Sequence, residues 1–408
     1  MDRGSRNAGP RAVTPAKTRR VLSLSTLFPN DAHPRFGIFV AKSLEALQRD
    51  THWEAVVVNP IGLPPVVMGR YRALQQAASD ATDFGMSVHR PTFRLIPKFG
   101  GRLNPGLIAR AVLPLAKMLH AEQPFDLVDA QFFYPDGPAA MLIARELGLP
   151  FSVKARGADV HYWGARSYGR TALLDTADAA AGMLAVCDAL AEDMATLGMD
   201  RGKITTHYTG LDRDLFRPLD HTGLRQRISG TFDVPIAAGD KLLLTVGALI
   251  SRKGQGCVIK ALGDLPDARL LLVGKGEDEA SLRTLAKEVG VADRVHFLGS
   301  QPPSSLPPLY SAADAMVLPS ASEGLANAWI ESLACGTPLV ITDAGGAREV
   351  VRGPEAGVIV ARTVRAIAEG IRLVTDRPRA PEVVAGAVDG FSWEANGAAL
   401  AAHYDSLL

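Results

Sequence analysis

The chain has 408 residues, with 44 Lys and Arg against 43 Asp and Glu, so its formal charge is only +1. This length exceeds one typical hydrophobic core, and we expect two domains. The balanced charge gives no field that would attract nucleic acid, and no apolar run reaches the roughly 18 residues of a membrane-spanning helix. Three widely spaced cysteines favour buried thiols in a reducing compartment over disulfides or a metal site.

The first 20 residues are basic and rich in Gly, Pro and Thr, a composition that predicts a disordered tail. They lack the apolar stretch of a signal peptide, so we expect a cytoplasmic protein. Basic residues attract anionic lipid. The tail is therefore interpreted either as a peripheral contact with the inner face of the membrane or as a solvated segment without a specific role.

Strand-like and helix-like segments alternate after the tail, which is typical of a doubly wound parallel sheet. Strands are predicted at 21–28, 56–58, 87–95, 127–133, 183–187 and 203–207, with helices at 38–48 and 107–120. Gly37 stands where the first helix should begin, and a glycine there lets the backbone approach a ligand closely. An alternative interpretation is ordinary turn chemistry.

Residues 154–160 follow a predicted strand, at the edge where parallel sheets bind ligands. The loop resembles one that often carries His-Gly-Ser-Asp or Arg-Gly-Ser-Asp in retaining glycosyltransferases of the family-4 type. This resemblance implies that Arg156 stabilises a donor phosphate or the acceptor, and that Asp159 orients Arg156 or binds an acceptor hydroxyl. A structural Arg–Asp pair is the alternative. Arg156 cannot act as a base at neutral pH. Farther along, Asp212 and Asp214 lie where the chain leaves the first domain, and we expect no metal there.

Residues 218–240 are polar and contain glycine, so they are interpreted as a linker. The second half then predicts strands at 241–246, 269–273, 295–299, 316–318 and 339–342. The loop after the first of these begins with Gly247 and ends with Arg252, Lys253 and Gly254. Two cations at the end of a strand suit a diphosphate leaving group. A solvated Arg-Lys turn is the alternative.

A helix is predicted to open at Glu323 and Gly324, to run to Cys335 and to stop at Gly336. Eight helical residues rise about 12 Å, which is close to the span from hexose to ribose in a nucleotide sugar. Glu323 and Glu331 would then each hold one sugar, while free amides near the helix start would face the phosphates. The alternative is that Glu323 only complements the helix dipole and that Glu331 is solvated.

The two glutamates, with Ala-Cys-Gly-Thr-Pro after the second and Asp-Ala-Gly-Gly beyond, resemble the motif of retaining glycosyltransferases of the family-4 type. The resemblance implies the α/β fold called GT-B, in which two Rossmann-like, doubly wound domains face each other across a cleft. It places these domains at 21–217 and 241–390, with a final helix at 391–408 that crosses back to the first domain. Ala248 departs from the family, which often has Arg there, and we infer that Arg252 supplies the missing cation.

The resemblance implies transfer of a hexosyl unit from a UDP- or GDP-hexose to a hydroxyl of a saccharide or lipid-linked acceptor, with retention, in bacterial polysaccharide or glycolipid synthesis. Protein charges make a metal or another cofactor unnecessary. Alternatives are a nucleotide-sugar epimerase and a catalytically silent, sugar-nucleotide-binding subunit. The residues expected at the reacting centre are Glu323, Lys253, Arg252, Arg156 and Asp159, and those expected to bind the donor are Gly37, Gly247, Gly324, Leu325, Ala326, Asn327 and Glu331.

Overall fold

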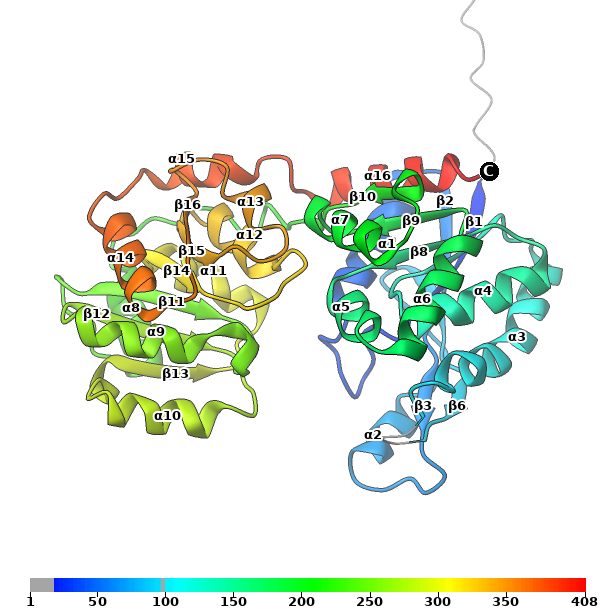
Figure 1. Cartoon of the computed structure of the whole chain (residues 1–408), viewed down its shortest axis with the longest axis horizontal. Coiled ribbons are helices and arrows are strands. Elements are labelled where there is room, and N and C mark those ends of the chain that lie inside the picture. Colours follow the sequence, from blue (N-terminus) through cyan, green and yellow to red (C-terminus); the bar gives the residue numbers. More distant parts are fainter. Residues whose placement is uncertain (1–17, 97–99) are drawn as a thin grey trace, which may run out of the picture.

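The computed structural model describes residues 18–96 and 100–408, which form two α/β domains side by side along the long axis (Figure 1). The first domain contains a sheet of order β10-β9-β8-β7-β1-β2-β5-β4, and the second contains a sheet of order β13-β12-β11-β14-β15-β16. In both sheets the strand order departs from the chain order near the middle, next to β1 and β11. Crevices at such reversals are the usual ligand sites of α/β sheets.

In the first sheet, every pair of strands is parallel except β4 and β5. Its central strands, such as β7 and β8, are buried throughout, because helices cover both faces. The strands are β1 (Arg19–Leu24), β2 (Trp53–Val58), β4 (Ala81–Asp83), β5 (Met86–His89), β7 (Leu127–Ala130), β8 (Phe151–Ala155), β9 (Gly182–Ala185) and β10 (Ile204–Thr206). The helices are α1 (Ile38–Asp50), α3 (Asn104–Glu122), α4 (Asp136–Leu147), α5 (Ala158–Gly164), α6 (Ser167–Ala179) and α7 (Asp188–Leu197).

The single strand predicted at 87–95 is two strands in the structure. Pro91 separates β5 from β6 (Thr92–Arg94), since proline has no N–H to continue a ladder. β6 instead pairs with β3 (Ile61–Leu63) in a small separate sheet. This sheet and α2 (Arg70–Gln76) extend from the lower edge of the first domain in Figure 1.

The second sheet is parallel throughout, and its two faces carry separate hydrophobic clusters. Leu242 and Leu244 of β11 belong to one cluster and Leu243 to the other, as the alternation of side chains along a strand requires. The strands are β11 (Lys241–Val246), β12 (Ala268–Val273), β13 (Val295–Gly299), β14 (Ala315–Leu318), β15 (Leu339–Thr342) and β16 (Gly357–Val360). The helices are α8 (Leu224–Phe232), α9 (Gln255–Ala261), α10 (Glu279–Glu288), α11 (Leu306–Ala312), α12 (Asn327–Ala334), α13 (Ala347–Val350), α14 (Val364–Thr375) and α15 (Pro381–Ala385).

The structure differs from the sequence prediction at the tail and at the linker. Arg19 and Arg20 belong to β1, and residues 1–17 of the predicted tail lie outside the described residues. Within the predicted linker, α8 buries Leu224 and Ile228 in a core cluster of the second domain. The polar composition of this segment predicted a linker, because only one side of the helix is apolar.

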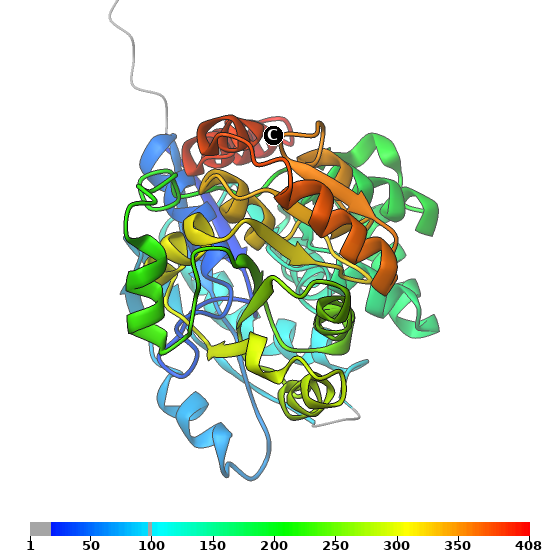
Figure 2. The ribbon, with the colours of Figure 1, turned by 90° about the vertical axis from the view of Figure 1, so that its left-hand side faces the viewer.

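The last helix, α16 (Trp393–Asp405), lies on the first domain, where it packs against α1 (Figures 1 and 2). Ser43 of α1 donates a hydrogen bond to the Asn396 side chain at 2.6 Å, and the His207 ring donates to the Asn396 carbonyl at 2.9 Å. Ser152 and His403 are also paired, at 2.8 Å. Among the described residues, every helix is too short or too polar to cross a membrane.

Candidate functional site

The segment after β14 carries Glu323, and its geometry differs from the prediction. α12 begins at Asn327, with Ala326 in an extended conformation before it, so Glu323 lies in a loop and Glu331 in the helix. The carbonyl of Gly324 accepts a hydrogen bond from the N–H of Gly346 at 2.8 Å. The Gly324 carbonyl is therefore bonded to a neighbouring loop and is not part of α12. The argument from a continuous helical rise between the two glutamates is wrong for this chain.

Glu323 nevertheless meets both predicted cations. Lys253 Nζ lies 2.6 Å from Glu323 Oε1, and Arg252 Nη1 lies 3.4 Å from Glu323 Oε2. Glu323 is only 8% exposed, whereas the Arg252 side chain is 42% exposed. Two cations beside one carboxylate leave this cluster with an excess of positive charge. Such a cluster can accept an anionic ligand, because ion pairs near the surface exchange readily with new partners.

The loop after β11 that carries these cations is packed against a glycine-rich loop after β12. A Cβ added at Gly274 would lie 1.9 Å from the carbonyl oxygen of Gly247, and one at Gly276 would lie 2.1 Å from that of Leu249. Side chains are therefore excluded at both positions. Gly274 and Gly276 serve here to let two backbones approach closely.

Glu331 projects from α12 toward α11. The hydroxyl of Tyr310, a fully buried residue, donates to Glu331 Oε2 at 3.0 Å. Burial raises the pKa of Glu331 to about 7, although the Tyr310 hydrogen bond opposes this shift. Sequence reasoning missed Tyr310, because its contact with Glu331 depends on how α11 packs against α12.

Arg156 directly follows β8 and Asp159 lies in the first turn of α5, and the two are not paired with each other through their side chains. Asp159 is 1% exposed, and its carboxylate accepts hydrogen bonds from the N–H groups of Phe133 at 2.8 Å and Arg156 at 3.0 Å. Arg156 Nε donates to the carbonyl of Gln131 at 2.7 Å, and its guanidinium lies over the ring of Phe39. Burial lowers the pKa of Arg156 to about 10.

These contacts bear on both interpretations of the loop. Both oxygens of Asp159 accept hydrogen bonds from backbone amides, so Asp159 holds the loop in shape, and its contact with an acceptor hydroxyl stays a prediction. The alternative of a simple Arg–Asp ion pair is wrong, since the Arg156 side chain bonds to Gln131 instead.

The loop at Arg156 touches the loop at Glu323 across the two domains. A Cβ added at Gly324 would lie 2.6 Å from the carbonyl oxygen of Arg156, and one at Gly157 would lie 3.1 Å from the backbone of Gly324. Glycine at both positions allows the backbones of the two domains to meet. The structure therefore brings the predicted loop at Arg156 and the predicted loop at Glu323 together.

A second contact between the domains involves residues that sequence reasoning missed. Glu349 of α13 accepts hydrogen bonds from the N–H groups of Asp188 at 2.9 Å and Ala189 at 3.0 Å, at the start of α7. The hydroxyl of Tyr208 also donates to Glu349, at 2.7 Å. A carboxylate is favourable at a helix N-terminus, where the free amides and the helix dipole attract it.

Gly37 is the residue before α1, as predicted, and it needs to be glycine. Its φ is +73°, and a Cβ there would lie 2.2 Å from the carbonyl oxygen of Leu27. Close by, the buried carboxylate of Asp136 accepts hydrogen bonds from the N–H and the hydroxyl of Thr26, both at 2.8 Å. Burial raises the pKa of Asp136 to about 7. No motif in the sequence pointed to Asp136.

Asp212 and Arg213 have structural roles. The side chain of Asp212 accepts from the N–H of Leu215 at 3.0 Å, and Arg213 donates to the carbonyl of Phe391 at 3.1 Å. Within residues 18–96 and 100–408, no group of three or more His, Cys, Asp or Glu has an arrangement that could hold a metal ion.

Two α/β domains that each contain a largely parallel sheet form the GT-B fold, which is a fold of glycosyltransferases. Residues 37–210 match the family model described as "Glycosyl transferase 4-like domain", and residues 230–387 match the model described as "Glycosyl transferases group 1". The chain belongs to the group 1 glycosyltransferases, and it is an enzyme of this class.

Relatives and solved structures agree with this assignment. A teichuronic acid biosynthesis glycosyltransferase of Bacillus subtilis is 27% identical over 86% of this chain and 88% of its own length. A GDP-mannose-dependent phosphatidylinositol monomannoside mannosyltransferase of Mycolicibacterium smegmatis is 35% identical over 47% of this chain and 53% of its own length.

Among solved structures, sucrose-phosphate synthase of Thermosynechococcus elongatus has a TM-score of 0.76 at 20% identity, over 95% of this chain and 99% of that chain. Anabaena HepE, in complex with UDP and glucose, has a TM-score of 0.68 at 18% identity, over 95% of this chain and 100% of that chain. At these identities the likeness shows the fold.

Proposed function

We propose that this glycosyltransferase moves a hexosyl unit from a nucleoside diphosphate sugar to a hydroxyl group, with retention of anomeric configuration. The observation that carries the proposal is the contact of Glu323 with Lys253 and Arg252 at the carboxyl ends of β14 and β11. Parallel sheets bind their ligands at this edge. Retention rests on the resemblance of the Glu323 and Glu331 motif to the retaining family.

The two cations suit the departure of a diphosphate. As the bond between the anomeric carbon and the phosphate oxygen breaks, negative charge grows on the oxygen that leaves, and Lys253 and Arg252 stabilise it. Arg252 reaches Glu323 at 3.4 Å, which supports its replacing the cation missing at Ala248. Glu323 accepts hydrogen bonds from the hexose hydroxyls and orients the ring, and it does not act as a covalent nucleophile.

Glu331 binds the ribose hydroxyls, and Tyr310 fixes the orientation of its carboxylate. Gly37, Gly247, Gly324, Leu325, Ala326 and Asn327 contribute backbone around the diphosphate. The donor is a UDP- or a GDP-hexose. A GDP-mannose-dependent relative and a UDP-bound structural neighbour support these two nucleotides.

The acceptor in this proposal is a saccharide or a lipid-linked saccharide of the bacterial cell surface. Relatives named for teichuronic acid, a phosphatidylinositol mannoside and inositol 3-phosphate support this class. We place the reaction in the cytoplasm, with the first domain against the inner face of the membrane. Val66 and Met68 are 66% and 64% exposed, just before the exposed Arg70 and Arg72, which supports a contact with anionic lipid.

A thermal-shift panel of UDP-, GDP- and ADP-sugars, without added metal, tests the donor site. A donor at a hundred times its dissociation constant stabilises the fold by about 2.7 kcal/mol. We expect one nucleotide class to raise the melting temperature, and Glu331→Ala to abolish that increase. Glu288→Ala, an exposed glutamate at the end of α10, is the matched control. An undiminished shift in Glu331→Ala would remove Glu331 from the donor site.

Product analysis then separates the remaining enzyme activities. Transfer requires an acceptor and forms a new glycoside with retained configuration. Formation of an isomeric nucleotide sugar without an acceptor would identify an epimerase. Tight donor binding without turnover on any acceptor would identify a catalytically silent subunit.

A further inference from the structure

Gln131 is a fully buried residue of the first domain that holds the side chain of Arg156. It directly follows β7, in the middle of the sheet. Arg156 Nε donates to the Gln131 carbonyl at 2.7 Å, and Arg156 Nη2 donates to Gln131 Oε1 at 2.8 Å. One edge of the guanidinium is therefore bonded at two points to a single residue, which fixes the plane of the guanidinium.

Asp129 fixes the orientation of the Gln131 amide. Gln131 Nε2 donates to Asp129 Oδ2 at 2.6 Å, and the same oxygen accepts from Ser23 Oγ at 3.1 Å. A guanidinium can only donate hydrogen bonds, so Oε1 of Gln131 faces Arg156 and Nε2 faces the carboxylate. The N–H of Gln131 also donates to the carbonyl of Leu24, at 3.1 Å. Both the backbone and the amide of Gln131 are therefore held in place.

The opposite edge of the Arg156 guanidinium is open. Nη1 forms no hydrogen bond with any described residue, and it does not belong to the buried polar atoms that lack a partner, so it retains accessible surface. The carboxylates of Asp129, Asp136 and Asp159 lie nearby, but each bonds to other groups. Arg156 has a pKa of about 10 and is charged at neutral pH. Nη1 is thus a charged donor that an anion can reach.

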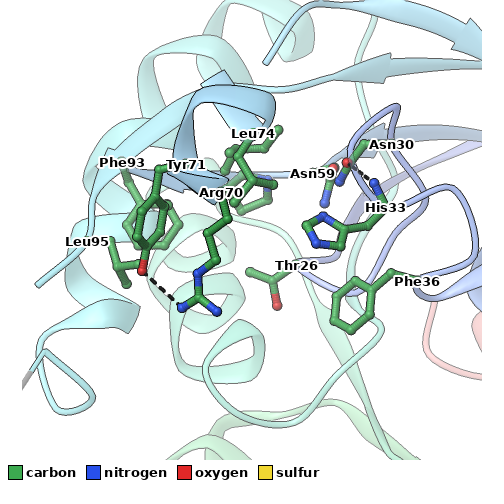
Figure 3. Close-up of a pocket in the computed structure, with 13 residues that line it drawn as sticks. Thr26, Asn30, His33, Phe36, Asn59, Arg70, Tyr71, Leu74, Phe93 and Leu95 are labelled. Carbon is green, nitrogen blue, oxygen red and sulfur yellow. Dashed lines mark hydrogen bonds between the residues drawn. The ribbon is translucent and has the colours of Figure 1, made fainter. Parts of the chain in front are cut away.

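Arg70, another arginine of the first domain, is held much less firmly. It is exposed on α2 and lines a cavity of about 360 Å³, where its Nη2 lies 3.3 Å from the hydroxyl of its neighbour Tyr71 (Figure 3). An exposed arginine with one such contact keeps most of its rotamer freedom. Two bonds to a buried residue remove that freedom at Arg156 before any ligand binds.

Arg156 lies between two parts of the proposed donor site. Its guanidinium lies over the ring of Phe39, 4.6 Å from the centroid, in the first turn of α1, which begins after Gly37. Its carbonyl faces the second domain, since a Cβ added at Gly324 would lie 2.6 Å from the Arg156 oxygen. Gly37 and Gly324 are both assigned to the diphosphate in the function proposed above. The open edge of Arg156 is therefore beside the position proposed for the diphosphate.

We propose that Gln131 is a positioning residue of the transferase. By holding one edge of the Arg156 guanidinium, it directs Nη1 toward the diphosphate of the donor, and Asp129 keeps the Gln131 amide in the required orientation. Gln131 itself does not contact the substrate. In its absence the donor would have to immobilise the Arg156 side chain on binding, and the affinity for the diphosphate would fall. The inference rests on the transferase function proposed above and adds a buried residue that acts through another side chain.

Nucleoside diphosphates and the nucleosides without phosphates test this role. The affinities of UDP, uridine, GDP and guanosine are measured by titration calorimetry with the full chain, and the ratio of each diphosphate to its nucleoside is the phosphate preference. We expect Arg156→Met to lower this preference about tenfold or more, because a charge-assisted hydrogen bond is lost. Gln131→Met should lower it about three- to tenfold, because one side chain must be ordered on binding. Nucleoside affinity should stay unchanged in both variants, which a general loss of structure would not give.

A double variant separates positioning from a structural role. In Arg156→Met, adding Gln131→Met should cause no further loss of phosphate preference, because no guanidinium is left to position. Ser152→Ala is the matched control and should keep the wild-type preference. Ser152 is fully buried in the neighbouring strand β8 and bonds to His403 at 2.8 Å, not to Arg156. If melting curves show that Gln131→Met does not fold, Arg156→Lys takes its place, since lysine keeps the charge without the two-point contact and should also lower the preference.

Three results would overturn the inference: an unchanged phosphate preference in the variant that lacks the two-point contact, the same loss in Ser152→Ala, or an equal further loss in the Arg156→Met background. If the diphosphates still bind in these cases and Glu331→Ala still weakens them, the transferase proposal stands and only the role of Gln131 fails. If neither UDP nor GDP binds, both fail.

Discussion

The two domains present opposite kinds of surface at the place where they meet. Around Glu323 on the second domain, ionised side chains are paired with one another, as Lys253 and Glu323 are at 2.6 Å. Around Arg156 on the first domain, charged side chains bond to backbone or amide groups, as Asp159 and Arg156 do. The loop at Glu323 is therefore held by ion pairs, whereas hydrogen bonds to backbone and amide groups hold the loop at Arg156.

The largest effect should follow from removing the paired cation. We expect Lys253→Met to lower the transfer rate about 10²- to 10³-fold, because one preorganised group that stabilises developing charge is lost. It also leaves the buried Glu323 with only the more distant Arg252. Steady-state kinetics measure the rate. Lys260→Met, an exposed lysine of α9, is the control and should keep the wild-type rate.

The first domain should be more sensitive to backbone changes than to charge. Gly37→Ala forces a Cβ to within 2.2 Å of the Leu27 carbonyl oxygen at a φ of +73°, so we expect the domain to lose about 3 kcal/mol of stability. Gly148→Ala is the matched control. Gly148 has a φ of +68° and no atom within 4 Å of an added Cβ, so only the conformational cost of about 1 kcal/mol applies. Denaturant unfolding compares the two, and equal losses would mean that the clash is relieved.

The pH dependence of donor binding probes the buried acid of the second domain. Since burial raises the pKa of Glu331 to about 7, its carboxylate is mostly ionised at pH 8 and mostly protonated at pH 6. We expect donor affinity to fall about tenfold from pH 8 to pH 6, measured by calorimetry. Glu331→Gln should remove this dependence.

The same titration has a consequence for stability. Between the ordinary glutamate pKa and about 7, the folded chain binds more protons at Glu331 than the unfolded chain does. The contribution of Glu331 to the free energy of unfolding therefore falls as pH rises through this range. In Glu331→Gln this decline should be absent, and an unchanged profile would contradict the raised pKa.

The smallest effect on stability should follow from removing one hydrogen bond between the two domains. Tyr208→Phe removes the hydroxyl that donates to Glu349 at 2.7 Å, and we expect a loss of about 1 kcal/mol, the usual net value of one hydrogen bond. Differential scanning calorimetry measures the loss. Tyr162→Phe, which changes an exposed tyrosine of α5, should leave the unfolding temperature within error.

Much of the fold could be predicted from the pattern of apolar residues. The strands β1, β2, β7, β11 and β15 lie at or near their predicted positions, because strands buried on both faces are short apolar runs. The start of α1 after Gly37 was also predicted. The predictions failed where local propensity was ambiguous, as for the polar α8 and the late start of α12.

The sequence alone determined the two-sheet architecture and the residue types of the site, since buried runs, glycines and a Glu-x7-Glu spacing are local patterns. Only the tertiary structure decided which groups meet. Glu349 reaches the first turn of α7 from 161 residues away, and Arg252 and Lys253 reach Glu323 from about 70. Each carboxylate can bond to any amide or cation within reach. The packing of whole helices and loops decides which amide or cation each carboxylate contacts, and local sequence patterns do not predict that contact.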